Sequence, residues 1–210
     1  MSWDICTVRG QRDRNEDYAL FGEGIGACVA DGIGGAPLGD AIARCACHAA
    51  LSSLEAGSTP FNAMRDACFC VDRMIRDLEL QGSGAALTVV KFHDRHVEAA
   101  WMGDVAFCVA EGSGVVKTNF DELDLCGPKI TQCVGAGECN PHFVEFDVAS
   151  DAKIALCTDG VWKEIGKDEI VRRISAASSP QEATARLVLG RKAHDNATAL
   201  VLFPEAVEVA

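Results

Sequence analysis

The sequence predicts an α+β fold in which helices cover the faces of antiparallel sheets, and three observations support this class. First, apolar side chains recur every three or four positions over residues 60–80, which is the period of an amphipathic helix. Second, several short β-branched and apolar runs follow one another through the middle of the chain, separated by Gly, Asp and His turns. Third, two helical stretches and a last strand come after them, so that runs of strands alternate with pairs of helices.

The elements follow in order from the local patterns. Strand-like residues at 18–21 and 26–30 come first, and the glycines of 32–35 then indicate a turn. An Ala-rich stretch over 39–54 predicts the first helix, and Pro60 opens the second because the first turn of a helix tolerates proline. The remaining strands are expected at 85–92, 97–101, 105–110, 115–117, 143–148, 153–158 and 197–203, and the remaining helices at 167–176 and 180–190.

The length of 210 residues suits one domain with a full hydrophobic core. No internal repeat and no Pro-, Gly- or Ser-rich linker divides the chain, so residues 1–210 are expected to form a single domain. No stretch approaches the roughly 20 apolar residues of a membrane span, and no basic region leads into an apolar run after Met1. We therefore expect neither a membrane protein nor a secreted one.

The net charge of the chain limits the classes of binding partner, and its cysteine content indicates the cellular compartment. Nineteen basic against thirty-one acidic residues give a net charge of −12, which repels phosphate backbones and argues against nucleic acid as a partner. The eleven cysteines are odd in number, and several lie inside apolar runs, as Cys28 and Cys157 do. They are expected to be reduced thiols in a cytoplasmic protein and not a disulfide framework.

Two cysteine pairs, Cys45 with Cys47 and Cys68 with Cys70, carry the thiolates that zinc binds. Positions two apart on a helix point to nearly opposite sides, so neither pair is expected to chelate an ion. Buried thiols are the favoured interpretation.

Four aspartates at the ends of predicted strands, or in the turns between them, are the strongest chemical signal. Asp31 and Asp159 follow apolar strands, Asp195 precedes the last strand, and Asp104 lies in a turn between two middle strands. A lone Asp-Gly is usually a turn or a helix cap. Four half-buried carboxylates with no Lys or Arg next to them in sequence are costly, however, unless a cation neutralises them. Hard divalent ions such as Mg²⁺ and Mn²⁺ prefer oxygen ligands, and a pair of ions requires a carboxylate that bridges both.

A glycine-rich segment and a charged loop accompany these acids. The glycines of 32–35 would let the backbone pass close to an ion or ligand, although an ordinary turn would also use them. Arg12, Asn15, Glu16 and Asp17 form a charged group that, taken alone, indicates a solvated loop.

Six short motifs, taken together and in order, span nearly the whole chain: Arg12-x-x-Asn15-Glu16-Asp17, Asp31-Gly32-Ile33-Gly34-Gly35, Gly84-Ala85-Ala86, Met102-Gly103-Asp104, Thr158-Asp159-Gly160-Val161-Trp162 and Asp195-Asn196-Ala197-Thr198. They resemble the motifs of the metal-dependent protein serine/threonine phosphatases of the 2C type (PPM family), and the resemblance is closest to the compact bacterial members. It implies a four-layer α-β-β-α sandwich, in which two antiparallel sheets are flanked by helix pairs and the metals lie at one end between the sheets.

The resemblance also assigns metal ligands. Asp31 would bridge two Mn²⁺ or Mg²⁺ ions, with Glu16 and the carbonyl of Gly32 on one ion and with Asp159 and Asp195 on the other. Asp104, together with Asp159, would offer a third, weaker ion site.

Three further residues would act around the ions. Arg12 would bind the substrate phosphate, a role that suits a planar and always charged guanidinium. Asp17 would fix Arg12 or a metal-bound water molecule, and Asn196 would orient the loop around Asp195.

The activity implied is hydrolysis of phosphoserine and phosphothreonine in proteins, a reaction that commonly opposes serine/threonine kinases. A water molecule bridging two divalent ions would lose a proton near neutral pH and attack phosphorus in line, while Arg12 and the ions offset the charge on the equatorial oxygens. The mechanism needs no phosphoenzyme.

Two departures from the family pattern bear on the chemistry and the substrate range, and two alternatives stay open. Ile33 stands where many members have a histidine, which leaves the proton donor for the leaving group open. The flap region, residues 119–141, is expected to be reduced. One alternative is a non-catalytic member that binds a phosphoprotein or a kinase as a regulatory module. The other is a two-metal hydrolase of a different phosphoester such as a nucleotide, although the chain lacks an aromatic cluster for base stacking.

Overall fold

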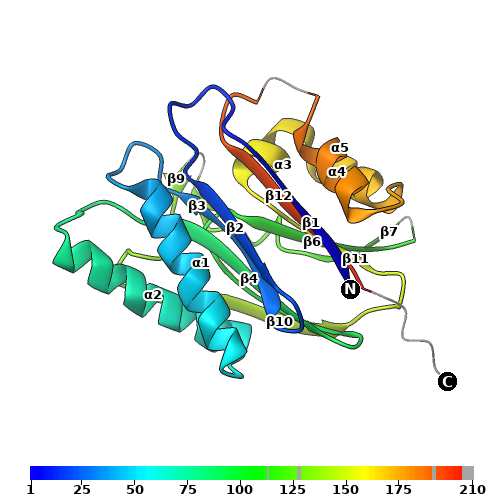
Figure 1. Cartoon of the computed structure of the whole chain (residues 1–210), viewed down its shortest axis with the longest axis horizontal. Coiled ribbons are helices and arrows are strands. Elements are labelled where there is room, and N and C mark those ends of the chain that lie inside the picture. The colour runs from blue at the N-terminus through cyan, green and yellow to red at the C-terminus, as the bar shows by residue number, and fades with distance from the viewer. Residues whose placement is uncertain (113, 127–128, 191–192, 205–210) are drawn as a thin grey trace.

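Two five-stranded antiparallel sheets stack face to face in the computed structural model of the chain (Figure 1). The structure describes residues 1–112, 114–126, 129–190 and 193–204. The first sheet has the strand order β1 (Ser2–Val8), β12 (Ala197–Phe203), β11 (Lys153–Cys157), β6 (Ala106–Glu111) and β7 (Gly114–Thr118). The second sheet has the order β10 (His142–Asp147), β5 (His96–Met102), β4 (Ala85–His93), β3 (Gly26–Gly32) and β2 (Asp17–Gly22).

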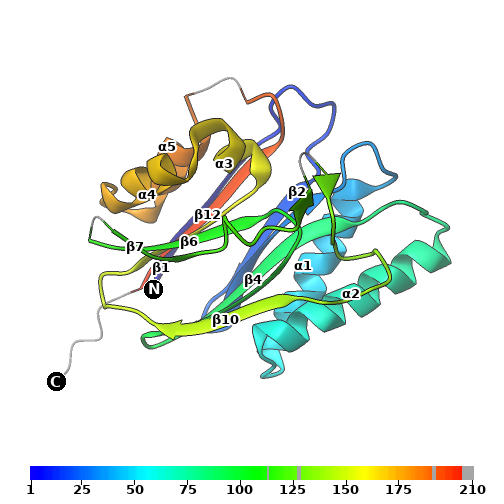
Figure 2. The same cartoon turned by 180° about the vertical axis from the view of Figure 1, so that it is seen from behind.

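Helices cover the outer face of each sheet, as the view from behind also shows (Figure 2). Helices α1 (Gly39–Glu55) and α2 (Pro60–Asp77) lie on the second sheet, and α3 (Asp159–Ile165), α4 (Lys167–Ser175) and α5 (Pro180–Val188) lie on the first. The predicted α+β class and its helix–sheet–sheet–helix layers are confirmed. The first sheet, however, carries α3 in addition to the expected helix pair.

Three apolar clusters separate these layers, and strand β3 shows how one sequence serves two of them. Cys28 and Ala30 belong to the cluster under α1 and α2, whereas Ala27 and Val29 belong to the cluster between the sheets. All four side chains are fully buried. Because alternate residues of a strand point to opposite faces, a strand packed on both faces reads as a continuous apolar run.

The helix starts follow from local chemistry. The Thr59 side chain accepts a hydrogen bond from the backbone N–H of Asn62 (3.3 Å), and Pro60 occupies the first turn of α2. Ser179 caps α5 in the same way, accepting from the backbone N–H of Glu182 (3.2 Å) ahead of Pro180. A hydroxyl before a helix satisfies one of its unpaired N–H groups.

Strand β1 and helix α3 are among the elements that were not predicted. Strand β1 is an edge strand whose residues are exposed or only partly buried, so it lacks a strong apolar pattern. Helix α3 has seven residues and begins at Asp159-Gly160, a pair that is typical of a turn.

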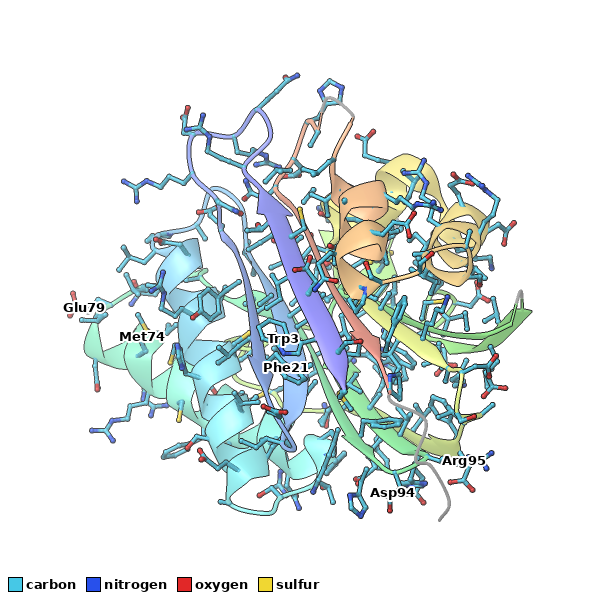
Figure 3. The ribbon with its side chains drawn as sticks, turned by 45° about the vertical axis from the view of Figure 1, so that its right-hand side comes forward. Trp3, Phe21, Met74, Glu79, Asp94 and Arg95 are labelled. Carbon is cyan, nitrogen blue, oxygen red and sulfur yellow. The ribbon has the colours of Figure 1, made fainter. Side chains whose placement is uncertain are left out.

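The edge strands of the two sheets meet through an aromatic pair. Trp3 of β1 stacks on Phe21 of β2 with ring centroids 4.7 Å apart (Figure 3).

Among the described residues, no helix is long and apolar enough to cross a membrane.

The cluster between the sheets should dominate stability. Phe107 lies in it on β6 and is fully buried, whereas Phe69 on α2 is 64% exposed. We expect Phe107→Ala to lower the free energy of unfolding by about 3–5 kcal/mol because it leaves a cavity between the sheets. The matched variant Phe69→Ala should change it by less than about 0.5 kcal/mol. Urea unfolding measures both values, and equal effects would contradict this assignment of the core.

Candidate active site

A small acidic cavity of about 110 Å³ lies where strands of both sheets end. Five carboxylates line it: Glu16, Asp31, Asp104, Asp159 and Asp195. Arg12, Gly32 and Asn196 line the same cavity, so the fold gathers these sequence-predicted residues in one place. Asp17 is not among the lining residues and lies beside them on β2.

Asp31 and Asp17 face each other across neighbouring strands. They are direct partners in the register of β3 with β2. Burial, and then the charge of Asp17 and the other acids, raises the pKa of Asp31 well above its usual range. Burial also raises the pKa of Asp17 to about 7, although hydrogen bonding from the Thr198 and Thr158 side chains offsets part of this effect. Like charges in such positions repel each other, so both can be ionised together only when a cation lies close by.

Asp17 is held by the other sheet. The Thr158 hydroxyl donates to Asp17 Oδ2 (2.9 Å), and Thr158 lies between β11 and α3. This contact differs from the expected one with Arg12, whose guanidinium bonds to Asp195.

Asn196 ties the loop before β2 to the loop that carries Asp195. Its side-chain oxygen accepts a hydrogen bond from the backbone N–H of Glu16 (2.8 Å), and its side-chain nitrogen donates to the carbonyls of Arg9 and Arg14 (both 2.8 Å). Its own backbone N–H donates to Asp195 Oδ1 (2.8 Å). Asn196 therefore holds Glu16 and Asp195 in fixed positions relative to each other.

The Glu16 carboxylate fits into a space left by glycine. A Cβ atom added to Gly39, at the start of α1, would lie 2.9 Å from Glu16 Oε1, so no other residue fits there without displacing the carboxylate. Burial raises the pKa of Glu16, which Arg12 opposes in part.

Arg12 reaches the cavity and pairs with one of its acids. Its Nη2 donates to Asp195 Oδ2 at 2.5 Å, and this hydrogen bond raises the pKa of the guanidinium. The Arg12 side chain is nevertheless 48% exposed. It is the one basic side chain among the described residues that line the cavity.

A second cation, Lys163, stands between two of the acids and was not predicted from the sequence. Its Nζ lies 2.6 Å from Asp159 Oδ2 and 3.3 Å from Asp104 Oδ2. Burial lowers the pKa of Lys163, but hydrogen bonding and charge from Asp159 and Asp104 outweigh burial and raise it. The aspartates have no basic residue next to them in sequence, but the fold brings Lys163 to two of them. The expectation that no basic side chain neutralises them was therefore wrong. The spacing of four residues from Asp159 on a helix was the signal that could have found Lys163.

Helix α3 is also fastened to the turn that carries Asp104. Trp162 Nε1 donates to the backbone carbonyl of Asp104 (2.8 Å). Burial, and then the charge of Asp159, raises the pKa of Asp104.

Gly103 gives the turn before Asp104 its shape. It has a φ of +91°, and a Cβ atom there would lie 2.6 Å from the Cβ of Ala86. A side chain at this position would therefore be strained and would clash. Two of the sequence motifs, at 84–86 and 102–104, thus meet by packing against each other.

The flap region is anchored to this turn by Asp124, which the sequence did not single out. Asp124 Oδ2 accepts a hydrogen bond from the backbone N–H of Gly103 (2.8 Å), and Oδ1 contacts Gln132 (3.0 Å) and His142 (2.9 Å). The region forms a two-stranded hairpin, β8 (Leu125–Cys126) and β9 (Lys129–Ile130), whose Ile130 lines the cavity. Residues 127 and 128 lie outside the described part of the chain.

One sequence spacing would indicate a different chemistry, because Cys6 and Arg12 stand six positions apart, as in the Cys-x5-Arg loop of cysteine phosphatases. Cys6, however, lies within β1 opposite Ala199 and packs towards the helices on the first sheet. Burial, followed by the charge of Asp4, raises the pKa of the Cys6 thiol. Cys6 does not line the acidic cavity, which argues against a cysteine nucleophile.

The cysteine pairs on the helices differ in exposure, as expected of positions two apart. Cys47 and Cys68 are buried, whereas Cys45 is half-buried and Cys70 is exposed. His194, beside Asp195, is exposed.

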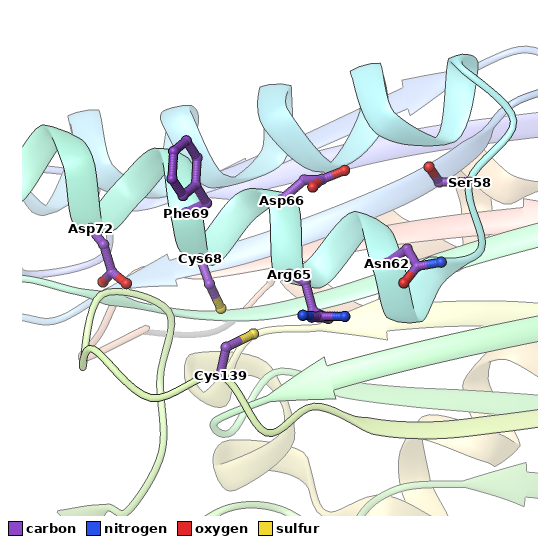
Figure 4. A pocket seen from close by; sticks show the side chains of 8 residues that line it. All are labelled: Ser58, Asn62, Arg65, Asp66, Cys68, Phe69, Asp72 and Cys139. Carbon is purple, nitrogen blue, oxygen red and sulfur yellow. The ribbon is translucent and has the colours of Figure 1, made fainter.

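A larger hollow of about 630 Å³ runs along α2 and contains none of the predicted site residues (Figure 4). Cys68 of α2 and Cys139 of the loop before β10 point into it. Burial raises the pKa of the Cys68 thiol, so it is a poor nucleophile. The converging carboxylates, and not cavity size, identify the candidate active site.

The donor set of the acidic cavity fits a hard divalent cation. The negatively charged atoms in its lining are all carboxylate oxygens, the ligands that Mg²⁺ and Mn²⁺ prefer. Asp17 Oδ1 and Asp104 Oδ1 are buried without a hydrogen-bond partner. In the described part of the chain, no three acidic, His or Cys side chains are already arranged to hold an ion, and Arg12 and Lys163 take up oxygens of three of the aspartates.

Comparison with solved structures supports the fold. PppA, described as a key regulatory component of T6SS in Pseudomonas aeruginosa, is 23% identical, with a TM-score of 0.81 over 96% of this chain and 97% of that one. The catalytic domain of the serine/threonine protein phosphatase PstP, in complex with two manganese ions, is 19% identical, with a TM-score of 0.81 over 95% and 96%. The PPM Ser-Thr phosphatase MsPP of Mycobacterium smegmatis, in complex with cacodylate, is 20% identical, with a TM-score of 0.80 over 97% and 98%.

Sequence comparison identifies the family. No curated protein sequence matches the chain. The family model described as protein phosphatase 2C matches residues 9–188, which include every predicted site residue except Asp195 and Asn196. Since this match covers most of the chain, the chain belongs to the protein phosphatase 2C family of protein serine/threonine phosphatases.

Proposed function

We propose that this chain hydrolyses phosphoserine and phosphothreonine in proteins by direct attack of water on phosphorus, with two divalent cations, Mn²⁺ or Mg²⁺, as cofactors. The observation that carries the proposal is the convergence of five carboxylates and Arg12 on one cavity. Members of the family are metal-dependent, and the manganese complex of PstP, a protein of the same fold, supports the choice of ions.

Different residues of the chain would bind each of the two ions. Asp31 would bridge both, Glu16 and the carbonyl of Gly32 would complete one site, and Asp159 and Asp195 would complete the other. Bound divalent ions would lower the pKa of a water molecule towards neutrality and offset phosphate charge. Asn196 would hold the two ion sites in fixed positions relative to each other through its hydrogen bonds to Glu16 and Asp195.

Arg12 would bind the substrate phosphate. Its half-exposed guanidinium lies at the cavity and can present two N–H groups to a phosphate. Because one of them bonds to Asp195 in the structure, the phosphate would compete with this carboxylate for Arg12.

A water nucleophile agrees with the cavity lining. No Ser, Thr, Cys or His stands among the described residues that line it, so the carboxylates are the only side chains there that could form a covalent phosphoryl intermediate, and in the proposed mechanism they bind the ions. Ile33 lines the cavity at the position where many relatives have a histidine, and it can supply no proton to the leaving group.

The finer aspects of substrate and setting are also proposals. The short β8–β9 hairpin would act as a reduced flap and leave the cavity open to extended phosphopeptides. The partners would be phosphorylated proteins of a serine/threonine kinase pathway. The location would be cytoplasmic, in keeping with free buried cysteines such as Cys28 and Cys47.

A regulatory, non-catalytic role is the second candidate. It is favoured by the two cations already paired with the acids, Arg12 with Asp195 and Lys163 with Asp159, and by a relative of the same fold described as a regulatory component. The intact carboxylate set favours catalysis.

Loss of the bridging acid should abolish the activity. We expect the wild type to hydrolyse p-nitrophenyl phosphate with Mn²⁺ and to stop when EDTA is added. Asp31→Ala and Asp159→Ala should each lower kcat at least about 100-fold, since each removes a ligand of the ions that would offset charge in the transition state. Asp147→Ala, which removes an exposed aspartate at the end of β10, is the control and should keep full activity. A folded wild type that binds Mn²⁺ but is inert would favour the regulatory candidate.

Metal should stabilise the protein. Ions that bind only the native state raise its stability by about 2.7 kcal/mol at 100 times the Kd, which is a rise in Tm of roughly 5–10 °C at this size. We expect such a rise for the wild type with Mn²⁺ in differential scanning fluorimetry, reversed by EDTA. Asp31→Ala should lose most of it. An unchanged Tm with saturating Mn²⁺ and Mg²⁺ would argue against a metal enzyme.

The net charge of −12 should set a substrate preference. We expect phosphopeptides with basic flanks to be hydrolysed with kcat/KM about tenfold higher than acidic ones at low ionic strength, because opposite charges steer association. Added salt should reduce the difference. Equal rates on basic and acidic peptides would refute this preference.

A further inference from the structure

We propose that the Lys163 ammonium is a resident cation that takes the place of a third divalent ion between Asp104 and Asp159, so that this chain binds two ions and not three. The inference rests on the proposed function, because it concerns the occupancy of the same site. It makes Lys163 a positioning residue for the acids of the cavity.

The ammonium lies where a third ion would have to lie. An ion shared by Asp104 and Asp159 needs an oxygen from each carboxylate, and Lys163 Nζ contacts Oδ2 of both, at 3.3 and 2.6 Å. An ion bound to these two Oδ2 atoms would have to displace the ammonium, and an ion bound to the remaining Oδ1 atoms would lie close to its positive charge.

Helical spacing alone does not explain the contact with Asp104. The pair with Asp159 is an ordinary four-residue spacing on α3, which on an open surface contributes little. Asp104 is 59 positions away, and its side chain is only 3% exposed. Among the described residues, Lys163 is the one side chain that pairs with Asp104, so removing the ammonium would leave a buried charge uncompensated.

The position of Lys163 is fixed by its surroundings. Its Nζ lies 5.2 Å from the centre of the Trp162 ring, and the indole N–H of Trp162 bonds to the carbonyl of Asp104. The lysine stem and the Asp104 turn are thus held by the same neighbour. A cation placed in this way is already present before any ion binds.

The test counts Mn²⁺ ions bound to metal-free protein, by equilibrium dialysis with electron paramagnetic resonance, up to millimolar Mn²⁺. We expect two ions for the wild type and three for Lys163→Gln, whose neutral side chain frees both carboxylates. Lys163→Arg keeps the charge and should bind two. The double variant Lys163→Gln with Asp104→Asn should return to two, because the new ion loses a ligand.

The control is Lys167→Gln, which removes a lysine that pairs with the exposed Asp121 and should leave the count at two. Circular dichroism confirms folding, and Lys163→Met replaces Lys163→Gln if the latter does not fold. Three ions on the wild type, or two on both Lys163→Gln and Lys163→Met, would overturn the inference while leaving the two-metal function intact. A wild type that binds no ion would overturn the proposed function itself.

Discussion

Repulsion among carboxylates held in one place is the constraint on which the rest of this structure depends. Asp31 and Asp17 stand opposite each other on adjacent strands, and three more aspartates approach from other elements. Burial makes their charged forms costly, as the raised pKa values of Asp31 and Asp17 indicate. The three apolar clusters provide the stability that holds these side chains together against their repulsion.

The sequence predicted the elements that carry a strong period or are buried on both faces. Helix α2 and strand β3 belong to this group, because their apolar residues leave little choice of face. It did not predict β1 or α3. An edge strand with polar, partly exposed residues has no clear alternation, and a seven-residue helix is too short to establish a period of its own.

Some residues of the candidate site could likewise be predicted from the sequence, and others could not. The acids and glycines could be predicted because each marks the end of a strand, and strands that end at one edge bring such residues together. The contact of Lys163 with Asp104 and that of Asp124 with Gly103 could not, since these partners are distant in sequence and come close only through the packing of α3 and of the flap region. Pairing that depends on tertiary contact leaves little trace in a single sequence.

The turn that carries Asp104 is therefore held from two sides, and this links the flap region to helix α3. On one side, Asp124 of the flap region accepts the Gly103 N–H. On the other, Trp162 and Lys163 of α3 bond to the backbone and the side chain of Asp104. A change in the flap region that shifts Asp124 would act on the turn of Gly103 and Asp104, and through this turn on the contact of Asp104 with Lys163. Residues of the flap region thus bear on the electrostatics of the acidic cavity through this turn, and Ile130 of the same region lines the cavity.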